Sequence, residues 1–140
     1  MSLTITVGHT AEAAHRIPVL SGVGAKCRNV HGHSFVIEWS FRADDVDLEQ
    51  VEFGRIKRVL RGWIDEHFDH GFVCHVDDPV GVFLAEQNLK VLTLPSWPTT
   101  EAIAQYLASV ADELLPELTL TGVLLREGPS NQARWTRDHG

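Results

Sequence analysis

Three side chains that can bind a soft metal ion or move a proton lie close together, at Cys27, His31 and His33, and Lys26 and Arg28 flank the cysteine. If the segment from His31 onward is a strand, side chains two residues apart point to the same face, so the two imidazoles converge. A catalytic zinc ion takes three protein ligands and keeps a fourth position open. The stretch therefore supplies two of these ligands, and the third has to come from elsewhere in the chain.

His15 is the candidate for the third ligand. Residues 3–7 alternate apolar and polar side chains, and the strand that this predicts is expected to continue to His15. Strands joined by a loop commonly pair as antiparallel neighbours, which would bring His15 to face His31 and His33. Three imidazoles with an open position predict a Zn2+ site that lowers the pKa of a bound water or alcohol. Alternatively, His15 is an ordinary strand residue and residues 31–33 form a turn.

Cys27 has two interpretations. Its cationic neighbours Lys26 and Arg28 and a nearby divalent ion would depress the pKa of the thiol and make the thiolate available as a base or nucleophile. Alternatively, Cys27 is a small buried hydrophobe, which is the commoner fate of a free cysteine. Cys74 has no flanking cations and is interpreted as structural. Free thiols are expected instead of a disulfide, because a reducing compartment is expected.

The elements that would position these residues follow from hydrophobic periodicity. From Ser34 onward, one side of a strand is apolar and shares the face of His33, with members Phe35, Ile37, Trp39 and Phe41. An acidic turn and a loop follow from Ala43. Spacings of three and four then predict an amphipathic helix with an apolar face of Phe53, Ile56, Leu60, Trp63, Ile64 and His67. The opposite face is interpreted as solvated, with a binding patch as the alternative, and carries Arg55, Arg58 and Arg61.

The first helix is expected to end near Asp69 and His70, with Gly71 as its C-terminal cap. Residues 82–84 are interpreted as a short amphiphilic piece and residues 91–94 as a brief strand or extended linker. In the stretch Trp97-Pro98-Thr99-Thr100-Glu101, a threonine followed by an acidic residue predicts a capped second helix, which Pro116 stops. Residues 118–127 and 132–136 predict two further strands around a turn. The expected order is two strands, two helices and two strands.

Two further positions carry titratable groups. Asp69 could orient His70 and make its imidazole a general acid or base, or the pair could serve only the helix dipole. Glu127 ends an apolar strand just before a Gly-Pro turn. Its carboxylate could accept two donors from a guanidine-like heterocycle, or it could form a surface salt bridge with Arg126 or Arg134.

Composition limits the class of protein. The 140 residues fit a single domain over residues 1–140, and the 44% hydrophobic and 22% charged content is ordinary for a globular protein. A net charge of -7 with scattered Lys and Arg argues against a nucleic-acid partner but allows a small anionic substrate. No apolar run approaches the roughly 20 residues that span a bilayer, and no signal-like N-terminus is present. A cytoplasmic location without a membrane partner is expected.

Motifs spread along nearly the whole chain resemble the 6-pyruvoyltetrahydropterin synthase family. In order, they are Ala13-Ala14-His15, Cys27 with His31-Gly32-His33, Asp69-His70, Pro98-Thr99-Thr100-Glu101, and Glu127. The three-residue gap between Cys27 and His31 is similar to that of the bacterial 6-carboxytetrahydropterin synthase branch, whereas pyruvoyl-forming members typically have a longer gap.

The resemblance implies an α+β tunnelling fold (T-fold) of ββααββ order, with a four-stranded antiparallel sheet backed by two helices. Subunits of this fold form barrels through their sheet edges, commonly as hexamers, with a tetramer as the alternative, and place active sites between subunits. The roles implied by position are Zn2+ ligation by His15, His31 and His33, proton transfer by Cys27, Asp69 and His70, and pterin binding by Glu127, Thr99 and Thr100. Lys26 and Arg28 are triphosphate-binding candidates by charge and proximity alone.

The implied reaction converts 7,8-dihydroneopterin triphosphate to 6-carboxy-5,6,7,8-tetrahydropterin and releases acetaldehyde and triphosphate. The alternatives are a 6-pyruvoyltetrahydropterin synthase, a dihydroneopterin side-chain aldolase, and a pterin- or purine-binding module without turnover. Ala11, Glu52, Phe68 and Gly128 depart from residues usual in the family and bear on substrate preference more than on zinc binding. Queuosine, another 7-deazapurine and a secondary metabolite all remain open as destinations of the product.

Overall fold

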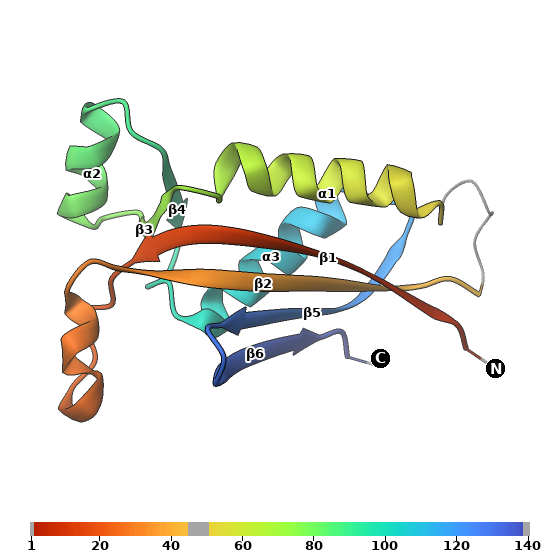
Figure 1. Ribbon diagram of the computed structural model, residues 1–140, viewed down its shortest axis with the longest axis horizontal. Coiled ribbons are helices and arrows are strands. Elements are labelled where there is room, and N and C mark those ends of the chain that lie inside the picture. The colour runs from red at the N-terminus through yellow and green to blue at the C-terminus, as the bar shows by residue number, and fades with distance from the viewer. Residues whose placement is uncertain (1, 45–50, 139–140) are drawn as a thin grey trace.

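The computed structural model describes residues 2–44 and 51–138 of the chain (Figure 1). Its elements in chain order are β1 (Thr4–His15), the 3-10 helix η1 (Gly22–Arg28), β2 (His31–Arg42), α1 (Phe53–His67), β3 (Phe72–His75), α2 (Pro79–Glu86), β4 (Val91–Leu94), α3 (Thr100–Leu114), β5 (Thr119–Glu127) and β6 (Asn131–Thr136). The acidic turn and loop predicted after Ala43 lie largely outside the described residues.

The six strands of the described residues form one sheet in the order β4-β3-β1-β2-β5-β6. β1 and β2 pair antiparallel along their whole lengths, with Val7 opposite Trp39 and His15 opposite His31. β5 pairs antiparallel with β2, and β6 pairs antiparallel with β5. These four strands are the predicted ones, and their antiparallel arrangement is confirmed.

The sheet has two strands beyond the predicted four. β3 pairs parallel with β1, and β4 pairs parallel with β3, so the chain crosses over between β3 and β4 through α2. Phe72, Val73 and Cys74 are all buried. Because both faces of this strand are covered, its sequence is a continuous apolar run without alternation. Asp78 caps α2 by accepting a hydrogen bond from Val80 N. The amphiphilic piece at residues 82–84 is therefore part of a helix, and residues 91–94 are a strand.

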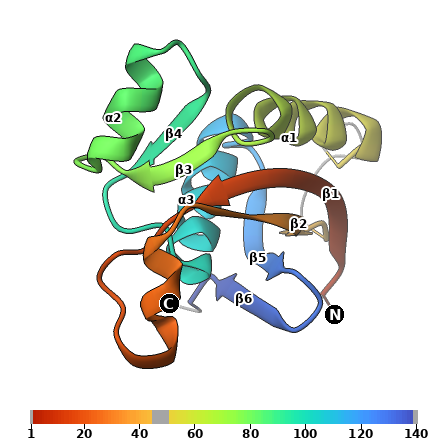
Figure 2. The same ribbon diagram turned by 60° about the vertical axis from the view of Figure 1, so that its left-hand side comes forward.

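α1 and α3 cover the sheet around one hydrophobic core (Figures 1 and 2). The core takes alternate strand residues and one face of each helix: Phe35, Ile37, Trp39 and Phe41 of β2, Ile56, Leu60 and Ile64 of α1, and Ile103, Leu107 and Ala111 of α3. Because successive strand residues point to opposite faces, His31 and His33 share the side of the β2 core residues. None of the helices in the described residues is long and apolar enough to span a membrane.

The arginines of α1 are not simply a solvated face. Arg61 donates two hydrogen bonds to Gly8 O, at 3.0 and 2.8 Å, and thereby ties the helix to β1. Arg55 pairs with Glu117 in the segment before β5. Arg58 is exposed, as predicted. The prediction was wrong for Arg55 and Arg61 because it considered the helix without the neighbouring backbone and carboxylate acceptors.

The end of α1 does not use the predicted glycine cap. The helix is capped at Phe68, and the residue with a positive φ is His70, at 61°. Lys90 Nζ donates to Asp69 O at 2.7 Å, so a cation satisfies a carbonyl just beyond the helix. Gly71 instead lies close to the preceding backbone: a Cβ atom there would be 3.0 Å from Phe68 O, a tight contact.

Candidate active site

Three histidines from β1 and β2 converge at one end of the sheet. His15 lies directly opposite His31 in the antiparallel ladder, and His33 follows two residues along β2 on the same face. The ring centroids are 4.6 Å apart for His15 and His31, 5.2 Å for His15 and His33, and 5.0 Å for His31 and His33. One possible ligand atom from each lies within 4.8 Å of the other two. The predicted convergence is confirmed, and metal ligation stays a prediction.

Backbone carbonyls orient two of the imidazoles. Nδ1 of His15 donates to Pro98 O at 2.8 Å, and Nδ1 of His31 donates to Asn29 O at 2.8 Å. A proton on Nδ1 leaves a lone pair on Nε2, which is the form of histidine that binds a metal ion. Within the described residues, Nε2 of His15 and Nε2 of His33 are buried and make no hydrogen bond of good geometry, although a carboxylate oxygen of Glu127 lies near both. Two buried imidazole nitrogens beside a carboxylate fit a cation such as Zn2+.

Glu127 lies against the histidine cluster from the side of β5. It is opposite Phe35 in the ladder of β2 and β5, so it faces the same side as His33. Its Oε1 lies 3.3 Å from His15 Nε2 and 3.2 Å from His33 Nε2. The imidazole of His15, followed by that of His33, holds the pKa of Glu127 below its usual value, although burial raises it. An ionised carboxylate is therefore favoured, and it can attract a cation or accept paired N–H donors from a ligand.

The pKa of His33 is lowered, although the carboxylate of Glu127 beside it raises it. Burial lowers the pKa of His33, and the neighbouring imidazoles of His15 and His31 lower it further, whereas Glu127 raises it. The neutral imidazole is thus favoured, and this is the protonation state that a metal ligand requires.

A cavity of about 660 Å³ opens beside the histidines and brings most of the predicted site residues together. Besides the three histidines, its lining includes Lys26, Cys27, Thr99, Thr100 and Glu127. The Thr99 hydroxyl also accepts a hydrogen bond from Ala102 N, so the predicted capped helix is α3 and Thr99 is the threonine that caps it. Sequence reasoning missed the lining residues Ile17, Leu20 and Asn131, which lie in or beside loops where no periodicity marks a lining position.

The two cations beside Cys27 differ in position. Both are exposed, but only Lys26 belongs to the described lining of the cavity. The backbone of Arg28 helps to hold this segment, because its carbonyl oxygen accepts a hydrogen bond from Arg16 Nε at 2.9 Å. Lys26, Cys27 and Arg28 are the last three residues of η1, which projects away from the sheet in Figures 1 and 2.

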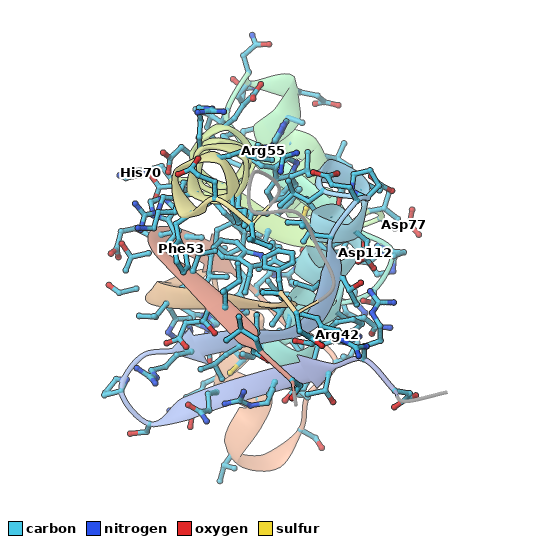
Figure 3. The ribbon with its side chains drawn as sticks, turned by 90° about the vertical axis from the view of Figure 1, so that its right-hand side faces the viewer. Arg42, Phe53, Arg55, His70, Asp77 and Asp112 are labelled. Carbon is cyan, nitrogen blue, oxygen red and sulfur yellow. The ribbon has the colours of Figure 1, made fainter. Side chains whose placement is uncertain are left out.

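Asp69 and His70 pair as predicted but lie apart from this cavity. His70 Nδ1 is 2.7 Å from Asp69 Oδ2, and Glu12 N donates to Asp69 Oδ1 at 2.8 Å. His70 lines a separate hollow of about 370 Å³ together with Glu12 and Ser34. The lining of this hollow also includes His33, so the hollow borders the histidine cluster, whereas Cys27 lines only the larger cavity. The His70 side chain is 76% exposed, and Figure 3 shows it at the outer rim of the molecule.

Comparisons with known proteins identify the family of this chain. Residues 4–138 match the family described as 6-pyruvoyl tetrahydropterin synthase. The chain belongs to this family. The 6-carboxy-5,6,7,8-tetrahydropterin synthase of Rickettsia bellii is 37% identical over 111 residues, which cover 76% of this chain and 76% of the relative. The protein of the same name from Aquifex aeolicus is 30% identical over 147 residues, which cover 96% of this chain and 87% of the relative.

Solved structures support the fold of this 6-pyruvoyl tetrahydropterin synthase family member. An uncharacterized protein of Wolinella succinogenes has a TM-score of 0.82 at 17% identity, covering 99% of each chain. The 6-pyruvoyl tetrahydropterin synthase of Caenorhabditis elegans has a TM-score of 0.68 at 23% identity, covering 99% of this chain and 97% of that one. The predicted family and the α+β tunnelling fold are confirmed.

Cys74 lies outside the candidate site of this family member. It is 1% exposed in β3, and burial, together with the charge of Asp78, raises the pKa of its thiol to about 11. Cys27 and Cys74 are both free thiols, as predicted. Such a thiol stays protonated at neutral pH, which fits the structural interpretation of Cys74.

Proposed function

We propose that the protein is a zinc-dependent lyase that acts on 7,8-dihydroneopterin triphosphate. With the addition of water, it would form 6-carboxy-5,6,7,8-tetrahydropterin and release acetaldehyde and triphosphate. The observation that carries the proposal is the single cavity lined by Cys27, Glu127 and the three histidines. The carboxy-forming branch is supported by the names of the Rickettsia bellii and Aquifex aeolicus relatives and by the short gap between Cys27 and His31.

The chemistry would be divided between a metal ion and a thiolate. Zn2+ held by His15, His31 and His33 would supply Lewis acidity that lowers the pKa of a substrate hydroxyl. Cys27, as a thiolate, would move a proton at the side-chain carbon beside the pterin ring. Its place in the wall of the same cavity supports this role.

Glu127 would orient the pterin. Its carboxylate would accept hydrogen bonds from the amino group and a ring N–H, and this bidentate pattern matches a guanidine-like edge. Thr99 and Thr100 line the same cavity and would border the ring. Lys26, which lines the cavity, and the exposed Arg28, which lies close to it in the chain, would bind the triphosphate. A Michaelis constant unchanged in both Lys26→Ala and Arg28→Ala would refute that role.

Asp69 and His70 would act from a neighbouring subunit. Asp69 would hold the tautomer of His70, and His70 would exchange a proton with a substrate hydroxyl. The absence of this pair from the lining of the cavity that contains Cys27, within the described residues, supports a site shared between subunits of a homo-oligomer, a hexamer or a tetramer. Mixed oligomers of Cys27→Ala and His70→Asn, each inactive alone, should then regain about a quarter of the wild-type activity on random assembly. Mixtures that stay inactive would contradict the shared site.

Metal analysis combined with a turnover assay tests the proposal as a whole. The wild-type protein should contain about one zinc ion per chain and release acetaldehyde and triphosphate. Cys27→Ala should keep the zinc and lose turnover by about 100-fold or more. Cys74→Ala, the same substitution at the buried thiol, should retain turnover. An active Cys27→Ala variant would refute the thiolate mechanism.

Mass spectrometry of the products separates the alternatives. A product that keeps all its side-chain carbons would identify a pyruvoyl-forming synthase, and pterin binding without turnover would identify a binding module. The match over residues 4–138 supports a single domain, and the two free thiols support a cytoplasmic location for the reaction.

A further inference from the structure

The segment that carries Cys27 is not held in place by its own side chains. None of the residues of η1 is buried, and Val23 is 97% exposed. In Figures 1 and 2, the segment projects from the end of the sheet. Because buried contacts do not fix η1, the position of its thiol depends on the hydrogen bonds at the base of the segment.

Two hydrogen bonds fasten this base to the end of β1. Ile17 N donates to Cys27 O at 2.7 Å, and Arg16 Nε donates to Arg28 O at 2.9 Å. The same guanidinium donates from Nη1 to Asp78 Oδ1 at 2.7 Å. Arg16 thus links the segment that carries the thiol to the capped start of α2.

Asp78 is the fixed end of this link. Its side chain is fully buried, and Oδ1 also accepts a hydrogen bond from Val80 N at 3.0 Å. Oδ2 is buried without a hydrogen-bond partner in the part of the chain that the structure describes. A buried carboxylate needs a cation beside it, and Arg16 supplies that charge. The ion pair with Asp78 holds the guanidinium of Arg16 in place. It therefore also fixes the orientation of the hydrogen bond from Arg16 Nε to Arg28 O.

We propose that Arg16 is a positioning residue that sets where the Cys27 thiol stands in the cavity, with Asp78 as its anchor. This inference rests on the proposed role of Cys27 and extends it to a residue that does not touch the substrate. Arginine suits the position because the donors of its planar fork point to two acceptors at once. A lysine ammonium is a compact point charge that cannot reproduce this geometry.

Arg16→Lys separates positioning from charge, because it keeps a cation for Asp78 and loses the fork. We expect kcat to fall about 10- to 100-fold, with the Michaelis constant within about twofold of wild type and the zinc content unchanged. Iodoacetamide should alkylate Cys27 up to about tenfold faster, because losing the bond to Arg28 O opens the segment. Cys74 is the unreactive reference, and Arg58→Lys on exposed α1 surface is the matched control.

The outcomes distinguish the inference from a structural role and from failure of the proposed reaction. Lower thermal stability of Arg16→Lys with unchanged kcat and unchanged alkylation would overturn the inference. Asp78→Asn, which retains an acceptor for Val80 N, should reproduce part of the loss in kcat, and an unchanged kcat would also count against it. If the wild-type protein does not turn over the pterin, the proposed function fails, but the alkylation rate of Cys27 still decides whether Arg16 positions the thiol.

Discussion

Gly81 is the position in α2 where one added methyl group tests how closely this helix lies against β3. A Cβ atom at Gly81 would lie 2.4 Å from Cys74 Sγ and 3.4 Å from Cys74 Cβ. Non-bonded heavy atoms approach to about 3.5 Å at their optimum, so the overlap with the sulfur is about 1 Å. Gly81 and Cys74 are both buried, and Gly81→Ala must therefore displace the thiol or move α2 away from β3.

The free energy of unfolding contains two opposing terms in this variant. Overpacking of a buried contact costs about 1–3 kcal/mol, whereas alanine in place of glycine within a helix contributes up to about 1 kcal/mol. In the wild-type background we expect net destabilisation. In a Cys74→Ala background the sulfur is gone and only the helical term remains, so the same substitution should stabilise the protein. The coupling between the two positions should be about 1–3 kcal/mol.

Denaturant unfolding of the four proteins of this cycle, at equal protein concentration, measures the coupling. Gly81→Ala should also lower kcat, because a shifted α2 carries Asp78 away from Arg16, and Cys74→Ala should restore both properties in the double variant. If Gly81→Ala changes stability equally in the two backgrounds, the close approach of α2 and β3 is not as described. If stability recovers in the double variant while kcat does not, the link from α2 to the site is refuted.

Three other substitutions probe the cavity and the surface. Glu127→Gln should raise the Michaelis constant about 10- to 100-fold at unchanged zinc content, because a charge-assisted hydrogen bond is lost. Glu113→Gln on the exposed surface of α3 is the control. A Michaelis constant for Glu127→Gln equal to that of the control would refute the role of Glu127 as the pterin anchor. Thr99→Ala should cost about 1 kcal/mol of unfolding free energy through the lost cap of α3, and Thr99→Ser should recover most of it. A hydrogen bond from its own backbone, and then Arg55, lower the pKa of Glu117. Because this folded-state pKa lies below the unfolded value, the stabilisation is present at neutral pH and is lost as pH falls through the folded-state pKa. The stability difference between Glu117→Gln and wild type, measured by urea unfolding, should therefore shrink on acidification, and a difference independent of pH would contradict the assignment.

The fold was predictable where hydrophobic alternation is long. In β2, Phe35 to Phe41 alternate over a strand that is buried on one face, and the parity of this pattern also places His31 and His33 correctly. The β3, α2 and β4 segment was not predictable in the same way. Phe72 to Cys74 do not alternate, and α2 has 8 residues, too few for a clear helical period. Its parallel pairing with β1 is a long-range contact that no local pattern encodes.

The site was predictable to the extent that its residues share a strand or a register. Glu127 could be placed at a strand end, but the approach of its carboxylate to His15 depends on the pairing of β2 with β5. The position of Cys27 depends on a contact between Arg16 and Asp78, which are 62 residues apart in sequence. An arginine directly after a histidine and an aspartate before Pro79 are each ordinary residues, and only the folded chain shows that they meet.

Asp69 and His70 lie outside the described lining of the cavity that contains Cys27. His70 N donates to Glu12 O at 2.6 Å, and Glu12 N donates to Asp69 Oδ1, so both residues are tied to the edge of β1. A non-glycine residue at positive φ is uncommon, and such a conformation persists where surrounding contacts enforce it. The His70 imidazole is therefore held in an exposed position outside the described lining of the cavity that contains Cys27. In the proposed reaction, this imidazole would therefore serve a substrate bound in the cavity of a second subunit.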